Sequence, residues 1–378
     1  MFNQLIALLI ATAIPALAFW IIYKLDMYKT GEYRVILASA VAGVAGFFLA
    51  SLINRTVLNL GWLAREDIIR YAAPVLEEIL KGLLLLYLVR RPNFTYFVEG
   101  AIYGFAAGMG FAIAENWQYV LAAKDAGLAI AIGRVLSTNL IHAATTAVLG
   151  MALGLARFQR GFRAILFGLG GLLLAILMHM AFNNMVTRVK SGILLIYATA
   201  CGLSAAGLIV YAIKRGLKEE KVWIEETLGA ADRVTNGEAA VVQSMDKIDK
   251  LLKPMEKRFG KQKTQQAKEF LIIQARLGLL RKSLEKLSDE RMKKSIEEQM
   301  GKLRGEMDTA RRQVGAYAML YLRQIFPEDS SPLWGKLESI LQERATRPAT
   351  SAINVFARAQ SALQERKQST ADNQEEKS

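Results

Sequence analysis

Long apolar runs and short polar connections alternate over the first 213 residues, and this pattern stops there. Each run is long enough for a helix that crosses the hydrocarbon core of a bilayer, which takes about 20 residues. The seven runs cover approximately residues 3–23, 34–53, 68–89, 97–120, 135–156, 163–187 and 192–213. The pattern therefore predicts an all-α fold, in which residues 1–213 form a polytopic membrane bundle of about seven spanning helices.

The first and fifth runs need separate interpretation. No basic residue precedes the first run, and Trp20 and Tyr23 suit the aromatic belt of a membrane interface. We therefore expect a retained spanning helix there rather than a cleaved signal peptide. The fifth run begins near Leu128, and we expect Arg134 to act as an interfacial anchor where this run enters the hydrocarbon.

The chain changes character from residue 214 onward. Apolar residues recur there every three or four positions among charged residues with high helix propensity. We expect a cytoplasmic, mostly helical region over residues 214–345. Residues 346–378 are rich in Gln, Ser, Thr and charge, which predicts a flexible tail.

Charged residues divide the chain at the same place. Residues 1–213 contain 16 Lys and Arg with 9 Asp and Glu, whereas residues 214–378 contain 32 and 25. The net charge of +14 is thus shared equally between the two parts. Basic loops and a cytoplasmic region that faces anionic lipid account for this excess, so we expect the lipid bilayer as a partner and no nucleic acid.

Lys and Arg are distributed unevenly between alternate connections. One set of connections contains twelve, namely Lys24, Lys29, Arg34, Arg90, Arg91, Arg157, Arg160, Arg163, Lys214, Arg215, Lys218 and Lys221. The other set contains six, namely Arg55, Arg65, Arg70, Lys124, Arg188 and Lys190. Because cytoplasmic loops are enriched in basic residues, the distribution predicts an N-terminus outside and a C-terminus in the cytoplasm. The expected location is a bacterial-type plasma membrane.

Four of the expected spans carry ionisable or polar residues, although each such group costs about 2.5–3.5 kcal/mol at the centre of a membrane helix on insertion scales. In chain order they are Glu77, Glu78 and Lys81; Glu115 and Asn116; His142, Thr145 and Thr146; and His179 and Asn183. Counted along each helix from the expected outer surface, the acids and histidines lie at a similar depth of roughly 8–15 Å. We therefore predict that the four helices surround one polar cavity.

Spacing along each helix indicates which side chains share a face. Glu77 and Lys81 are four residues apart, so they can form an ion pair that lowers the cost of burying both. Glu78 then points about 100° away and is expected to face the cavity. His179 and Asn183 are also four residues apart and present their polar groups in one direction.

These residue types support two mechanisms of hydrolysis. In the first, a carboxylate takes a proton from water while an imidazole and a carboxamide stabilise the oxyanion, and no cofactor is expected. In the second, two histidines and one carboxylate hold a catalytic zinc that keeps an open position for water. The zinc ligands would be His142 and His179 with Glu115 or Glu78. The residues allow either mechanism.

Taken together, the four motifs resemble those of the PrsW-type intramembrane proteases, which are related to the CAAX-prenyl-protease and bacteriocin-immunity superfamily. The motifs are Glu77-Glu78-x-x-Lys81, Phe111-x-x-x-Glu115-Asn116, His142 followed by Thr145 and Thr146, and His179-x-x-x-Asn183. The resemblance covers about residues 60–190. It implies hydrolysis of membrane-tethered protein substrates, such as anti-sigma-factor-like regulators, by a glutamate-activated water, although members were long described as metalloproteases.

The resemblance also implies a role for each site residue. By position, Glu77 and Glu78 hold the general base, and His179 and Asn183 bind the oxyanion. Glu115 and His142 orient or complete the site.

Two further features of the fourth run have structural interpretations. Gly100, Gly104 and Gly108 repeat every four residues, a pattern of small residues that allows membrane helices to pack closely. Glu99 lies near the expected cytoplasmic end of its helix, where we expect it to be solvated.

Two other functions are compatible with the same residues. Intramembrane acids and histidines also form proton relays, so a proton-coupled transporter or channel is one alternative. A non-catalytic scaffold, in which the membrane part only anchors the cytoplasmic region, is the other.

Overall fold

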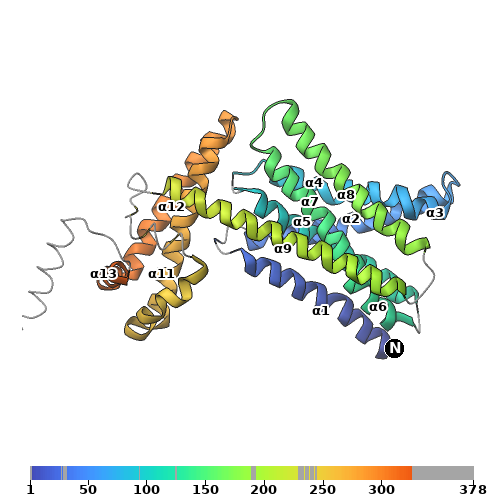
Figure 1. Ribbon diagram of the computed structural model, residues 1–378, viewed down its shortest axis with the longest axis horizontal. Helices are drawn as coiled ribbons and strands as arrows, with labels where there is room; N and C mark the ends of the chain where they lie inside the picture. The colour runs from blue at the N-terminus through green and yellow to red at the C-terminus, as the bar shows by residue number, and fades with distance from the viewer. Residues whose placement is uncertain are drawn as a thin grey trace, which may run out of the picture. The chain divides into compact units, whose positions relative to one another are not determined.

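The computed structural model of the protein describes residues 2–26, 28, 32–92, 94–123, 126–188, 193–228, 234, 238, 242 and 245–325. The tail expected at residues 346–378 lies outside this part of the chain. All regular secondary structure of the described residues is helical, as the hydropathy pattern predicts (Figure 1).

Most of the helices follow one another with short connections, and residues 228–244 separate α9 from η4. They are α1 (Phe2–Leu25), α2 (Tyr33–Asn59), α3 (Arg65–Asp67), the π-helical turn η1 (Ile68–Ala72), α4 (Ala73–Leu88), α5 (Phe97–Ala122), α6 (Gly127–Leu136), α7 (Thr138–Ala156), α8 (Phe162–Arg188), α9 (Ile193–Thr227), the 3-10 turn η4 (Met245–Lys247), α11 (Ile248–Lys286), α12 (Glu290–Val314) and α13 (Ala316–Ile325).

Six helical segments of the described chain are long and apolar enough to cross a membrane, against the seven expected. They are α1, α2, α5, the α6–α7 pair, α8 and α9. The remaining expected span, 68–89, is helical throughout, but a π turn shortens its α-helical part to α4 and three charged residues lie on it. The three charged residues are buried, and α4 packs against α2, α5, α7 and α8.

Helix α5 is the most buried of the spans and contacts α1, α2, α4, α6, α7 and α9. Its glycines permit a close approach to α7. A Cβ atom at Gly100 would lie 2.1 Å from the carbonyl oxygen of Gly150, and one at Gly108 would lie 2.3 Å from that of His142. Gly104 is equally crowded by α7. The predicted packing role of this glycine series is confirmed, and it brings the backbone of a candidate site residue against α5.

The fifth apolar run forms two helices, because the backbone of Ser137 (φ −126°, ψ −80°) interrupts it between α6 and α7. Arg134 lies in the last turn of α6. Its guanidinium pairs with Glu115 at 2.6 Å and is 17% exposed, and its role as an interfacial anchor stays a prediction.

Glu99 is fully buried, and the expectation that it is solvated is wrong. Its carboxylate accepts a hydrogen bond from the backbone N–H of Thr95. Helix α11 covers this end of α5, where the Ser283 hydroxyl donates to the Thr95 carbonyl at 3.0 Å. The prediction considered the membrane spans alone, so it did not include the burial of Glu99 by α11.

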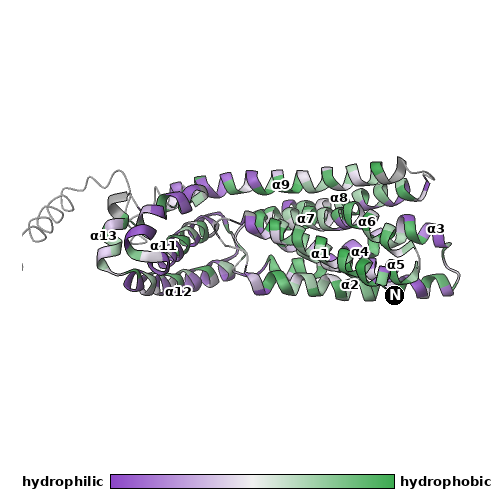
Figure 2. Cartoon of the chain, turned by 90° about the horizontal axis from the view of Figure 1, so that it is seen from below, coloured by the Kyte–Doolittle hydropathy of each residue, from purple (hydrophilic) through white to green (hydrophobic). Residues whose placement is uncertain are grey.

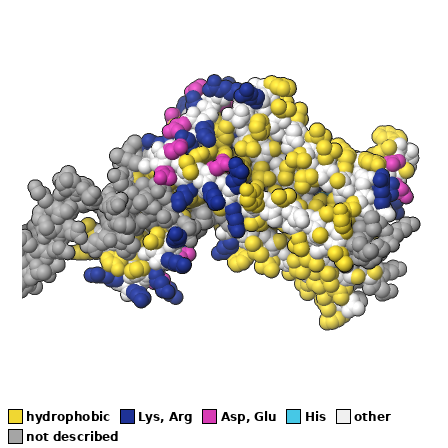
Figure 3. Space-filling view, viewed as in Figure 1, with side chains coloured by type: hydrophobic (Ala, Val, Ile, Leu, Met, Phe, Trp, Pro, Cys, Tyr) yellow, Lys and Arg dark blue, Asp and Glu magenta, His cyan; other side chains and the backbone are white. Residues whose placement is uncertain are grey.

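The helices beyond α9 are polar and pack mainly against one another. Helix α9 continues past residue 213 to Thr227, and its hydropathy changes from apolar to polar along its length (Figure 2). Helices α11 and α12 pack side by side, and Asp289 caps α12 by accepting from the N–H groups of Arg291 and Met292. Hydrophobic side chains cover most of the visible surface of the spans, and Lys and Arg gather nearer α9's polar end (Figure 3).

Candidate active site

Four helices bring most of the expected site residues to one pocket. A cavity of about 380 Å³ is lined by Glu77 from α4, Glu115 from α5, His142 from α7, and His179 and Asn183 from α8. Glu78 lies behind the cavity wall and is fully buried. The expectation of one shared cavity is therefore met by the geometry.

The expected roles of the two adjacent glutamates are reversed: Glu77 was expected to pair with Lys81, and Glu78 was expected to face the cavity. Lys81 pairs with Glu78, with 2.5 Å between Nζ and Oε1, whereas Glu77 lines the pocket. The hydroxyl groups of Thr145 and Thr146 lie 2.9 and 3.2 Å from the two oxygens of Glu78. The donors from α7 thus reach Glu78 rather than Glu77, so Glu78 is the buried acid whose carboxylate oxygens have hydrogen-bond donors.

His179 lies between the two glutamates. Its Nδ1 is 2.9 Å from Oε1 of Glu78, and its Nε2 is 3.8 Å from Oε2 of Glu77. Because Glu78 is held as an ion by Lys81 and can only accept, Nδ1 carries the proton. The lone pair of Nε2 then faces Glu77 and the pocket, as in histidines that a carboxylate orients for catalysis or metal binding.

His142 is held from both sides. Its Nε2 lies 2.9 Å from Oε2 of Glu115, and its Nδ1 lies 3.2 Å from Nζ of Lys81. The ammonium can only donate, so Nδ1 accepts and Nε2 donates to Glu115. Arg134 completes the network by pairing with Glu115, and it also donates to Asn116 at 2.7 Å. One continuous chain of hydrogen bonds thus joins both histidines to both buried ion pairs.

Asn183 lines the pocket, but its amide is engaged by the backbone of the π turn. Pro74 has no N–H with which to satisfy a carbonyl of the preceding turn. The Nδ2 of Asn183 donates to the Ile69 carbonyl at 2.9 Å, and that of Asn184 lies 3.4 Å from the Arg70 carbonyl. These two amides fasten α8 to the segment that leads into Glu77.

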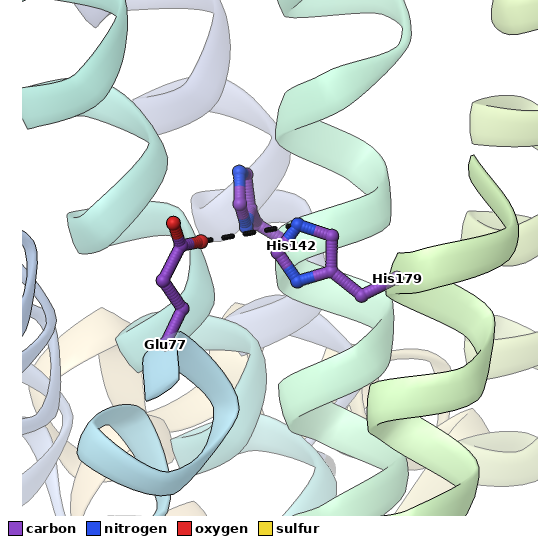
Figure 4. A group of neighbouring side chains, drawn as sticks. All are labelled: Glu77, His142 and His179. Atoms are coloured by element: carbon purple, nitrogen blue, oxygen red, sulfur yellow. Dashed lines mark ion pairs between the residues drawn. The ribbon is translucent and has the colours of Figure 1, made fainter. Parts of the chain in front are cut away.

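Glu77, His142 and His179 form the cluster of the described residues that could hold a metal ion (Figure 4). One possible ligand atom from each lies within 4.8 Å of the other two. Among the described residues, the buried Oε2 of Glu77 has no hydrogen-bond partner, and Nε2 of His179 lies 3.8 Å from it. A buried carboxylate oxygen without a partner is costly, so a cation or a polarised water fits here.

Comparison with known proteins identifies the membrane region. Residues 31–213 match the PrsW family intramembrane metalloproteases. This region belongs to the PrsW family. The match contains every residue that lines the pocket, and it makes the protein an integral membrane peptide hydrolase. No curated protein and no solved structure matches the chain.

The three residues of this PrsW region that could hold a metal ion differ from the expected ligand set in the identity of the carboxylate residue. His142 and His179 are both present, but the carboxylate beside them is Glu77 rather than Glu115 or Glu78. The reason is that Glu115 forms an ion pair with Arg134, and Glu78 forms one with Lys81. Two histidines and one glutamate are a ligand set known for catalytic zinc.

Helix α2 was not expected to contribute to the site, yet it lines one wall of the pocket. The lining residues are Phe47, Ala50, Ser51, Asn54, Arg55 and Leu58. They recur every three or four positions, and the polar members within an otherwise apolar run were the available signal. The PrsW pocket is therefore built from five spans rather than four.

Proposed function

We propose that the protein cleaves membrane-tethered proteins in the pocket between α2, α4, α5, α7 and α8. The observation that carries this proposal is the buried carboxylate oxygen of Glu77, which lies beside two imidazoles and has no hydrogen-bond partner among the described residues. Water that enters the pocket meets the carboxylate of Glu77 and Nε2 of His179 there. General base catalysis by such a group typically contributes 10²–10⁴-fold to the rate of hydrolysis, as an order of magnitude.

A metal ion fits this role. Glu77, His142 and His179 would hold it, and it would lower the pKa of a bound water and polarise the scissile carbonyl. Glu78 keeps Nε2 of His179 directed to the pocket by accepting from Nδ1. His142 is the least available of the three ligands, because both of its ring nitrogens already have hydrogen-bonding neighbours.

The same residues also support hydrolysis without a metal. Glu77 would take the proton from the attacking water and pass it to Nε2 of His179, which lies 3.8 Å away. The new N–H would then donate to the oxyanion. Asn183 would act mainly by holding α8 against η1, since its Nδ2 is engaged there. The metal content of active protein separates the two mechanisms.

The site determines where cleavage takes place. The exposed residues of the pocket lie at the end of α2, the start of α3 and near the ends of α5 and α8, which the positive-inside bias assigns to the outer side of a plasma membrane. The N-terminus would then lie outside and the helices from α11 onward in the cytoplasm. Anti-sigma-factor-like regulators are candidate substrates on the basis of the family resemblance.

The test compares membrane-protein fragments in cells that contain the wild type or Glu77→Gln, with Asp67→Asn as the matched control on the same segment. We expect fragments that the wild type and the control produce and that Glu77→Gln does not. Identical fragments in all three cells would contradict the proposal.

Elemental analysis of the purified proteins then separates the mechanisms. About one zinc per chain in the wild type and a loss in Glu77→Gln would support the metal mechanism. Full cleavage by a metal-free, chelator-treated wild type would support the metal-free one. Proton flux into liposomes without peptide cleavage would favour a transporter instead.

A further inference from the structure

The wall that α2 contributes connects the floor of the pocket to its mouth. At the floor, the ring of Phe47 lies 5.6 Å from that of Phe111, which in turn lies 5.1 Å from the ring of His142. Arg55 lines the same pocket eight residues further along α2. At 1.5 Å of rise per residue, Arg55 is about 12 Å from the level of the histidine.

Two arginines at the mouth have no acidic partner. Arg55 from α2 and Arg65 from α3 both line the pocket and are exposed, and neither forms an ion pair with a described residue. The neighbouring arginines differ in this respect. Arg70 pairs with Glu66 at 3.2 Å, and Arg134 pairs with a pocket carboxylate. Asp67, two residues from Arg65, is exposed but does not line the pocket. The lining at the mouth therefore carries two arginines that pair with no acid among the described residues.

The acids of the pocket do not neutralise this charge. Glu115 is already paired with Arg134, and Glu77 lies on the buried floor beside the two histidines. Two guanidinium groups from different helices thus line the mouth of the cavity, through which a peptide substrate would enter. Because a guanidinium presents a fork of donors, it suits a carboxylate.

We propose that Arg55 and Arg65 select substrates with an acidic side chain on the mouth side of the scissile bond. This inference rests on the proposed protease function and specifies its substrate class. An extended peptide advances about 3.3–3.6 Å per residue, so 12 Å corresponds to about four residues. The acidic residue is therefore expected three to five residues from the cleaved bond.

The experiment uses purified full-length protein in liposomes and a pool of single-span model substrates. The substrates share one transmembrane sequence, which is followed by a variable segment. They differ only in one residue, which is Asp, Asn or Lys. This residue lies three to five positions from the variable segment, on the side that faces the mouth of the pocket. The enzymes are the wild type, Arg55→Glu/Arg65→Glu, Arg55→Gln/Arg65→Gln, and the control Arg188→Glu. Arg188 is exposed at the end of α8 and does not line the pocket.

The expected readout is the ratio of cleavage of Asp to Lys substrates. Two exposed ion pairs predict a wild-type preference for Asp of about 3- to 10-fold. The double Glu variant should reverse the preference, the double Gln variant should abolish it, and Arg188→Glu should retain it. The Gln variant keeps the test valid if the Glu variant does not fold.

Three results would overturn the inference. A wild type that cleaves all three classes equally, or a double variant that keeps the wild-type preference, would refute the charge selection and leave the protease function intact. A double variant that loses all classes alike, and recovers when anionic lipid is replaced by neutral lipid, would assign the arginines to lipid headgroups. Failure of the wild type to cleave any substrate would refute the proposed function itself.

Discussion

At the scale of single residues, the distinction between Glu77 and Glu78 decides the chemistry. The sequence places both acids on one helix near Lys81, and spacing rules allow the lysine to reach either. What separates them is the supply of donors from α7, which no pattern within α4 contains. The sequence could therefore predict the members of the cluster, but it could not predict which acid lines the pocket.

The buried ion pair of Lys81 and Glu78 yields a stability prediction. Replacement Lys81→Met leaves the buried Glu78 carboxylate without its cation, so we expect a loss of roughly 3–5 kcal/mol in the free energy of unfolding. The double replacement Lys81→Met/Glu78→Gln should recover much of this loss. Thermal unfolding in detergent measures both.

The partly exposed pair of Arg70 and Glu66 is the matched control, and Nε of Arg70 also donates to the exposed Thr187 hydroxyl at 3.0 Å. Its side chains are 21% and 76% exposed, so Arg70→Met should cost less than about 1 kcal/mol. Equal destabilisation by the two Met variants would contradict the expected large contribution of the buried Lys81–Glu78 pair to stability.

At the scale of elements, hydropathy predicted the spans well and their interruptions poorly. Apolar runs report length and burial in lipid, and so α2, α5 and α8 lie close to their expected ranges. The break at Ser137 and the π turn η1 depend on contacts from neighbouring helices, which a single run does not contain. The wall contributed by α2 was missed although polar residues that recur every three or four positions along α2 marked it.

The contact of Asn183 with η1 leads to a second prediction. If Asn183 replaces a donor that Pro74 lacks, Asn183→Ala should destabilise the protein by about 1–2 kcal/mol and lower activity. Introducing Pro74→Ala should make Asn183→Ala nearly neutral for stability, because the backbone then supplies an N–H. Thermal unfolding of the four proteins in this cycle provides the measurement. Additive effects of the two replacements would exclude this positioning role.

At the scale of the whole described chain, the helices beyond the spans are joined to the start of α5. The rings of Tyr96 and Trp223 lie 4.2 Å apart, and Nζ of Lys286 lies 4.0 Å above the Trp223 ring. Burial in this junction lowers the pKa of Lys286. The same junction buries Glu99, which the hydropathy of α5 alone placed in water. Sequence periodicity predicted these helices but not where they attach.

A third prediction concerns this junction. Trp223→Ala removes the ring that Tyr96 and Lys286 contact, and a large buried aromatic typically contributes about 3–5 kcal/mol. We expect faster amide hydrogen exchange in the α11 segment around Ser283, measured by mass spectrometry on the full chain. Tyr317→Ala, at an 82% exposed aromatic, should leave this exchange unchanged. Unchanged exchange in Trp223→Ala would mean that other contacts hold α11.

The central claim is that Glu77 and the two histidines act together on a peptide bond. The most direct measurement is the cleavage rate of one tethered substrate by purified protein in liposomes, for the wild type and Glu77→Gln, with folding of both checked by thermal unfolding. The account predicts that Glu77→Gln remains folded and cleaves at least about 10²-fold more slowly. A folded Glu77→Gln protein that cleaves at the wild-type rate would contradict it.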